Sequence, residues 1–253
     1  MINSDDFEKE ILNRISLMTP PVDAGFIPKT TPVISFGDVT LANIATLGIN
    51  PSANEFMSGA NLLATDKKRL ADNEDYEAGP VDIWFRSRNY FMTGNAYWDW
   101  FQPLEDLLLA IGETYENYSS ACHLDLSPWA TFPAFGQLTP AQQSNLLSHD
   151  KELLPWLLAN SSIKTLLVNG RQAYETINST DQFKLEKVGE LEYMTGDRKV
   201  TSDLIAGESN DGKMVLGWTL NLQAMKVSNE VRQSVMGELS NWLKAQIGKG
   251  PRS

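Results

Sequence analysis

Short apolar runs alternate along this chain with stretches in which apolar residues recur at helical spacing. The apolar runs lie at 39–49, 120–127, 163–168 and 214–221. Helical spacing marks the stretches 5–18, 97–111, 140–158, 171–177 and 227–247. Parallel strands need a crossover connection, usually a helix, so strands that alternate with helices are typical of parallel sheets. The sequence therefore predicts an α/β fold with a largely parallel sheet.

The remaining segments indicate a single domain over residues 1–253. Residues 1–32 combine the first helix with a proline-rich connector. In residues 183–213 apolar and polar residues alternate weakly around several glycines. This pattern suggests a β-meander or an insertion that leaves the main fold. We expect the polar stretch 52–79 to form a helix and a loop that cover the site.

The composition limits the classes to which this chain can belong. Of its 253 residues 42% are hydrophobic, and no apolar run approaches the roughly 20 residues of a membrane span. The acidic, polar start does not resemble a secretory signal, so we expect a cytoplasmic protein with no membrane partner. Cys122 is the single cysteine, and His123 and His149 are the two histidines, so we expect no disulfide and no metal. The glycines of the stretch 189–212 lack phosphate-loop spacing, so we expect no cofactor. The net charge of −11 leaves room for a narrow basic groove at most.

A polar residue follows the first apolar run where its strand should end. Gly48-Ile49-Asn50-Pro51 closes this run. In open α/β sheets ligands bind outside the carboxyl ends of the strands, and a short amide fixed by a following proline suits a group that holds one water or ligand atom. Asn-Pro is also an ordinary turn dipeptide. Asn50 is therefore either a functional group or part of a plain turn.

Three separated segments carry recognisable motifs. The first is Gly48-Ile49-Asn50-Pro51, and the second is the segment 90–98, which reads Tyr-Phe-Met-Thr-Gly-Asn-Ala-Tyr-Trp. The third, 163–174, is an apolar strand followed by Asn-Gly-Arg-Gln-Ala-Tyr. In this order they resemble the uracil-DNA glycosylase superfamily, and most closely its mismatch-specific uracil/thymine-DNA glycosylase branch. This resemblance implies a three-layer α/β/α sandwich with a central four-stranded, mostly parallel sheet.

The resemblance also implies an enzyme that extrudes a deaminated or mismatched base from DNA and hydrolyses its N-glycosidic bond. By similarity Asn50 positions the attacking water, because an amide orients water but is not basic enough to take its proton. Tyr90 matches the aromatic residue that stacks on the extruded base, and Asp125 falls where related branches carry the residue that reads it. The residues that the resemblance places at the substrate are Gly48, Ile49, Pro51, Ser52, Tyr90, Asp125 and Asn221.

A loop after the last strand stands where the family contacts DNA. Met225 or Leu222 could act as an apolar wedge in the duplex, and Lys226 or Arg232 could meet a phosphate. We therefore expect DNA as the partner of a monomeric enzyme.

Several of these residues have a plain structural alternative. Tyr90 could be a core aromatic, and Asp125 could be a structural carboxylate near a strand end. We expect His123 to be a buried, hydrogen-bonded imidazole. Strand alternation places it on the same sheet face as Asp125, so the two could be in contact.

Two other functions stay open for the chain. A non-catalytic or divergent member of the same fold, acting as a binding module, fits the acidic composition and Ser52, which replaces the second glycine of the family motif. An unrelated α/β hydrolase would have a closed pocket too small for a nucleotide.

A DNA enzyme should show a strip of positively charged side chains beside Asn50. Two of the candidates for this strip, Arg86 and Arg88, lie in a segment that we predict to be a loop. The strip would be built from some of Lys67, Lys68, Arg69, Arg86, Arg88, Arg171, Lys226 and Arg232.

Overall fold

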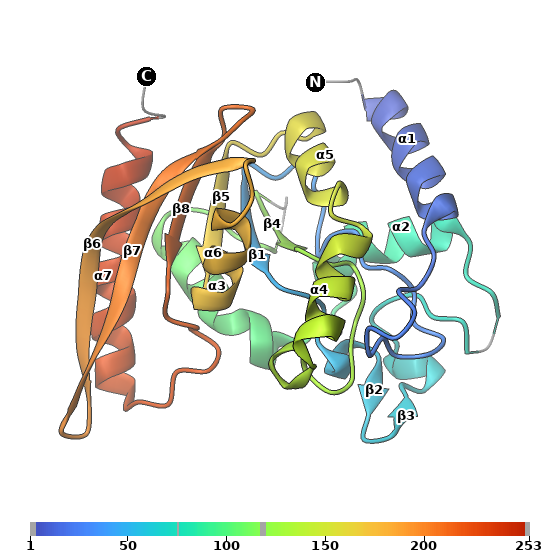
Figure 1. The fold of residues 1–253 in the computed structure, drawn as a ribbon, viewed down its shortest axis with the longest axis horizontal. Coiled ribbons are helices and arrows are strands. Elements are labelled where there is room, and N and C mark those ends of the chain that lie inside the picture. Colours follow the sequence, from blue (N-terminus) through green and yellow to red (C-terminus); the bar gives the residue numbers. More distant parts are fainter. Residues whose placement is uncertain (1–3, 75, 117–119, 251–253) are drawn as a thin grey trace.

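A mostly parallel sheet organises the molecule (Figure 1). The structure, a computed structural model, describes residues 4–74, 76–116 and 120–250, and within them six strands form this sheet in the order β4-β1-β5-β8-β7-β6. The strands are β1 (Ile44–Gly48), β4 (Ala121–Asp125), β5 (Thr165–Asn169), β6 (Phe183–Thr195), β7 (Arg198–Ser209) and β8 (Met214–Trp218). β4, β1, β5 and β8 are parallel, whereas β7 is antiparallel to β8, and β6 to β7. The predicted α/β fold with a largely parallel sheet is confirmed.

The prediction of four strands is wrong, because residues 183–213 extend the sheet. β6 and β7 form a long antiparallel hairpin, and β7 pairs with β8 so that Ile205 lies opposite Gly217. Leu204 and Ile205 on β7 are buried, whereas most of β6 is exposed or half-buried. A hairpin at the edge of a sheet buries few side chains, so it lacks the continuous apolar run that reveals the four parallel strands.

Helices cover both faces of the sheet (Figure 1). On one face, a core that includes Ile44 is shared by α3 (Trp98–Ala110) and α7 (Asn229–Ile247). On the other face, the core includes Ala45 and Leu47 and is shared by α1 (Ser4–Leu17), α2 (Pro80–Arg88), α5 (Leu153–Asn160) and α6 (Arg171–Asn178). Successive residues of β1 point to opposite faces, which separates the two cores. None of the described helices has the length and apolar character of a membrane span.

The stretch 140–158, predicted as one helix, forms two. α4 (Pro140–His149) ends at Asp150, and α5 begins at Leu153. Between them the carboxylate of Asp150 accepts a hydrogen bond at 2.7 Å from the indole Nε1 of Trp129. This side-chain bond fixes the turn that separates the two helices.

Two further local predictions are wrong. The described residues of the stretch 52–79 contain no α-helix, because its Asn and Gly residues favour turns. They form the short turns η1 (Ala53–Glu55) and η2 (Thr65–Lys67) and the hairpin β2 (Met57–Ser58) and β3 (Asn61–Leu62). Arg86 and Arg88 lie in α2 rather than in a loop, and this helix begins at Pro80, a residue favoured in the first helical turn.

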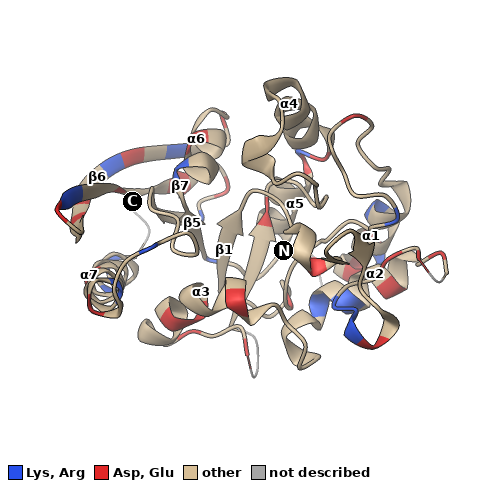
Figure 2. Ribbon diagram, turned by 90° about the horizontal axis from the view of Figure 1, so that it is seen from below, with Lys and Arg blue, Asp and Glu red and all other residues tan. Residues whose placement is uncertain are grey.

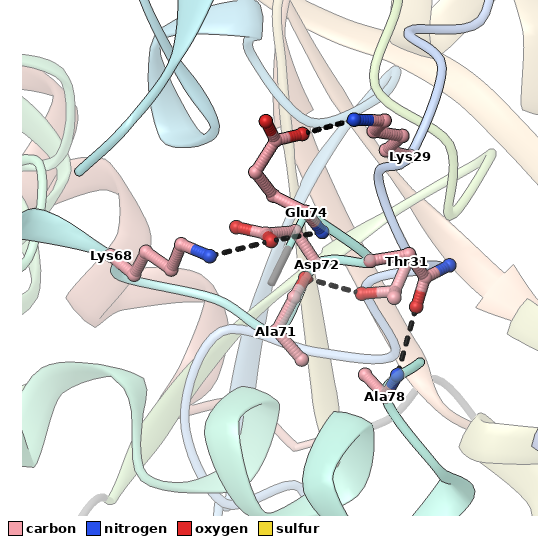
Figure 3. A network of polar contacts seen from close by, with 8 residues as sticks. Lys29, Thr31, Lys68, Ala71, Asp72, Glu74 and Ala78 are labelled. Carbon is pink, nitrogen blue, oxygen red and sulfur yellow. Dashed lines mark hydrogen bonds and ion pairs between the residues drawn. The ribbon is translucent and has the colours of Figure 1, made fainter. Parts of the chain in front are cut away.

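A polar network joins the proline-rich connector to the segment before α2 (Figure 3). Lys29 pairs with Glu74 at 2.7 Å, and the hydroxyl of Thr31 donates to the carbonyl oxygen of Ala71 at 2.6 Å. The buried carboxylate of Asp72 accepts from Lys68 at 2.8 Å and from the Glu74 N–H at 2.9 Å. These contacts fix the connector without a helix or strand of its own.

Candidate functional site

The amide of Asn50 is held in one orientation just after β1. Its Nδ2 donates to the carbonyl oxygen of Trp129 and to the hydroxyl of Thr131, both at 3.1 Å, and the Pro51 carbonyl lies at 3.3 Å. A backbone carbonyl can only accept, so the nitrogen must face Trp129. No hydrogen bond between described residues engages Oδ1, and Asn50 is half-buried rather than sealed. The amide oxygen is therefore available as an acceptor at this edge of the sheet.

The loop that carries Asn50 is anchored at both ends. The carbonyl oxygens of Gly48 and Ile49 accept from the backbone N–H groups of residues 126 and 127, at 3.3 and 2.9 Å, so the chain that follows β4 runs beside this loop. The hydroxyl of Ser52 caps the η1 turn by accepting from a backbone N–H at 3.2 Å. Ser52 therefore has a structural role at the position where the family motif carries a glycine.

A buried polar chain lies on β1 and β4. Thr46 stands opposite His123, and Gly48 stands opposite Asp125. Nδ1 of His123 lies 2.7 Å from the Thr46 hydroxyl, which is also bonded to the hydroxyl of Tyr115, and Nε2 lies 3.3 Å from Oδ1 of Asp125. The side chain of His123 is 1% exposed and that of Asp125 is 4% exposed. The predicted buried, hydrogen-bonded imidazole and its contact with Asp125 are both confirmed.

Gly48 is required by this polar chain. A Cβ at this position would lie 2.5 Å from Oδ1 of Asp125 and 3.0 Å from Nε2 of His123. We expect Gly48→Ala to force these side chains apart and to cost about 1–3 kcal/mol of unfolding free energy, measured by urea denaturation. Gly136→Ala is the control, because a Cβ there meets no atom within 4 Å. Equal losses in the two variants would contradict this prediction.

A second buried carboxyl, Glu55, belongs to the same region. It lies in η1, is 2% exposed, and its Oε2 accepts a hydrogen bond of 2.6 Å from the hydroxyl of Tyr90. Burial raises the pKa of Glu55 to about 7, against the lowering effects of the Tyr90 bond and of the Arg69 charge, and the charge of Asp125 raises it further. The site thus contains a carboxyl group that changes charge near neutral pH.

The prediction that Tyr90 stacks on a base is wrong. The residue is fully buried, and its ring contacts Phe36 and Phe101, with ring centroids 4.8 and 5.6 Å away. Burial also raises the pKa of its hydroxyl. The accessible aromatic residues include Trp100, which is half-buried with its ring 5.0 Å from that of His123, and Phe132, which is 67% exposed. Phe132 directly follows Thr131, which holds the Asn50 amide.

The loop after β8 also differs from its prediction. Leu222 and Met225 are 1% and 5% exposed, so neither can serve as a wedge in this conformation. The loop is instead shaped by Asn221, whose Oδ1 accepts from two backbone N–H groups of the loop, and by Arg232, which donates to the Met225 carbonyl at 2.7 Å. Asn221 and Lys226 are exposed.

Several basic residues predicted beside the site are engaged in internal contacts. Arg88 and Lys68 each pair with a buried aspartate, at 3.0 and 2.8 Å. Arg69 and Arg232 donate to backbone carbonyl oxygens. In the part of the chain that Figure 2 draws in colour, Lys and Arg lie in separate groups, on β6, on α7 and near α2, rather than in one band beside β1. Lys226 is exposed and remains a candidate for a phosphate contact.

The structure thus brings together some of the predicted residues and adds others. Asn50, Gly48 and Asp125 lie at the adjoining ends of β1 and β4. Glu55 was missed because it stands in a polar stretch without periodicity. The described residues contain no group of three or more His, Cys, Asp or Glu that could hold a metal ion.

In comparisons with known proteins, no family model matches the chain, and no curated protein matches its sequence. The function must therefore be inferred from the site itself.

Proposed function

We propose that this protein is a DNA base-excision glycosylase, which hydrolyses the N-glycosidic bond of an extruded, deaminated or mismatched base. The observation that carries the proposal is the fixed amide of Asn50. Its nitrogen is held by Trp129 and Thr131, which leaves its oxygen to accept from a water molecule at the end of a buried strand. A rigid acceptor holds a nucleophilic water in a single position, which lowers the entropic part of the barrier.

The reaction needs little acid–base chemistry from the protein. The oxygen of the water forms a bond to C1′ of the sugar, and the bond from C1′ to the base breaks. The electron pair of that bond leaves with the base, and the proton lost by the water neutralises it. Asn50 orients the water, and negative charge near the sugar stabilises the positive charge that C1′ develops.

Asp125 is proposed to define the base-binding side of the site, and His123 to hold its carboxylate from within the core. An ionised carboxylate can only accept hydrogen bonds, so Asp125 would accept from a ring N–H of the base, such as N3–H of uracil or thymine. The backbone of Gly48, Ile49 and the Pro51-Ser52 turn would line the edge of the base. Asn221 would complete the site from the loop after β8.

Contacts with DNA are proposed at the rim of the site. Trp100 and Phe132 take the stacking role first assigned to Tyr90, because they are accessible and lie next to His123 and Thr131. Lys226 would meet a backbone phosphate. The proposal also includes membership of the uracil-DNA glycosylase superfamily with its three-layer α/β/α fold, and a monomer that acts in the cytoplasm in DNA repair, without a cofactor.

The proposed activity is tested with duplex and single-stranded oligonucleotides that carry uracil, mismatched thymine, hypoxanthine or other deaminated bases. Excision is measured as strand cleavage at the abasic site after alkaline treatment. We expect at least one base to be excised, with Asn50→Ala strongly impaired. Absence of excision from every substrate would contradict the proposal.

A binding module with the same fold is the second candidate function. The internal pairing of Arg88 and Lys68 and the separate groups of cations in Figure 2 favour it. It predicts binding of an oligonucleotide or another partner without base release. Fluorescence anisotropy at low salt, where phosphate contacts are strongest, measures this binding. The strand-cleavage assay then shows whether the bound oligonucleotide also loses a base.

A further inference from the structure

The carboxyl group of Glu55 is enclosed one short turn after Asn50. Its Oε2 accepts from the Tyr90 hydroxyl at 2.6 Å, and the oxygen of that hydroxyl accepts from the backbone N–H of Tyr97 at 2.8 Å. Because Tyr97 supplies one hydrogen to the phenol oxygen, the phenol's own hydrogen is directed at Glu55. No hydrogen bond between described residues engages Oε1 of Glu55. The carboxyl can therefore gain or lose a proton at Oε1 without breaking this chain.

Charged and titratable groups from three other segments face Glu55. Tyr90 belongs to η3 (Tyr90–Met92), Arg69 lies between η2 and α2, and Asp125 ends β4. Arg69 is held in place, because it donates to the backbone carbonyl oxygens of Asn54 in η1 and of Asn95, at 2.7 and 2.9 Å. Burial, the largest effect, raises the pKa of Glu55 to about 7 even though Tyr90 and Arg69 oppose it.

A carboxyl at this position costs stability that an amide would not. Glutamine could accept the same hydrogen bond from Tyr90, but its burial would not place a negative charge in the core. Ionisable groups with strongly shifted pKa values, placed beside a specific charge partner, cluster at functional sites. Glu55 follows Asn50 by five residues, and the charge of Asp125 acts on its carboxyl group. This placement favours a functional reason for the acid.

We propose that Glu55 supports the hydrolysis through its negative charge, and that only its carboxylate form supports the reaction. This proposal rests on the proposed function. As the bond from C1′ to the base breaks and its electron pair leaves with the base, the sugar gains positive charge. Ionised Glu55 adds to the negative charge of Asp125 in a region of low dielectric, where it stabilises that positive charge more strongly than in water.

The test is the pH profile of single-turnover base excision by the 253-residue chain. For an active form that requires ionised Glu55, the rate should rise about 30-fold between pH 5.5 and pH 8.5, with a midpoint near 7. Glu55→Gln should flatten this rise to less than about 3-fold while keeping the bond from Tyr90. Glu8→Gln, a change on the exposed side of α1, should keep the full rise.

A second variant separates ionisation from a purely structural role. Tyr90→Phe removes a hydrogen bond that lowers the pKa of Glu55, so the midpoint of the profile should move to higher pH. A profile of Glu55→Gln that rises as in the wild type, or a midpoint unchanged in Tyr90→Phe, would overturn the role of Glu55 alone. Absence of excision from the wild type at every pH would overturn the proposed function as well.

Discussion

Replacing Asn50 by alanine is expected to slow base excision by at least about 100-fold, which is typical of the loss of one preorganised hydrogen-bonding group. The variant lacks the oxygen that positions the water, whereas the surrounding strands are unchanged. It also removes the bonds to Trp129 and Thr131, and we expect this to cost about 1 kcal/mol of unfolding free energy. Single-turnover rates measure the first effect, and urea denaturation measures the second.

Asn178→Ala is the matched control for this prediction. Asn178 is an exposed asparagine at the end of α6, far along the chain from the site. We expect its rate to equal that of the wild type. If Asn50→Ala excised bases as fast as the control, Asn50 would be the plain turn residue that its Asn-Pro sequence also allows.

Replacing Glu55 by glutamine is expected to stabilise the protein at alkaline pH. The pKa of Glu55 is raised to about 7 in the folded state, from 4.5, so the folded state binds its proton more tightly than the unfolded state does. Stability that is present at low pH is therefore lost as the pH rises from about 4.5 to about 7. A shift of this size corresponds to about 3 kcal/mol, and the glutamine variant escapes the loss because it cannot ionise.

The measurement is the difference in unfolding free energy between Glu55→Gln and the wild type at two pH values. We expect this difference to grow by about 3 kcal/mol in favour of the variant between pH 4.5 and pH 8. Comparing two pH values removes any constant effect of the amide. Glu8→Gln, an exposed change, should show no such growth. A difference that stays constant with pH would mean that Glu55 titrates normally despite its burial.

The parts of the fold that bury continuous apolar runs could be predicted from the sequence. An amphipathic helix lies between each of the strands around Leu47, Leu124 and Leu166 and the next parallel strand. Hydrophobic burial produces both the apolar runs of the strands and the helical spacing of apolar residues in the helices. The edge hairpin of β6 and β7 could not be recognised as part of the sheet, because it buries only part of one face. The break at Asp150 depends on a bond from Trp129, which is distant in sequence.

The site was predictable only where it coincides with a strand end. Asn50 and Asp125 could be placed because β1 and β4 end in turns marked by proline. Tyr90 was assigned the wrong surroundings, because an aromatic residue has the same sequence signature in a core as beside a ligand. Glu55 had no local signal, since its burial arises from Tyr90 and from segments that lie far away in the chain.

The most direct measurement is a single-turnover reaction in water enriched in ¹⁸O, with the oligonucleotide of the panel that reacts fastest. If the amide of Asn50 holds the attacking water, the wild type should release the free base and place ¹⁸O at C1′ of the sugar, while Asn50→Ala should do so at least about 100-fold more slowly. Release of no base from any oligonucleotide, or equal rates of labelling in the two proteins, would contradict this role of Asn50 at the end of β1.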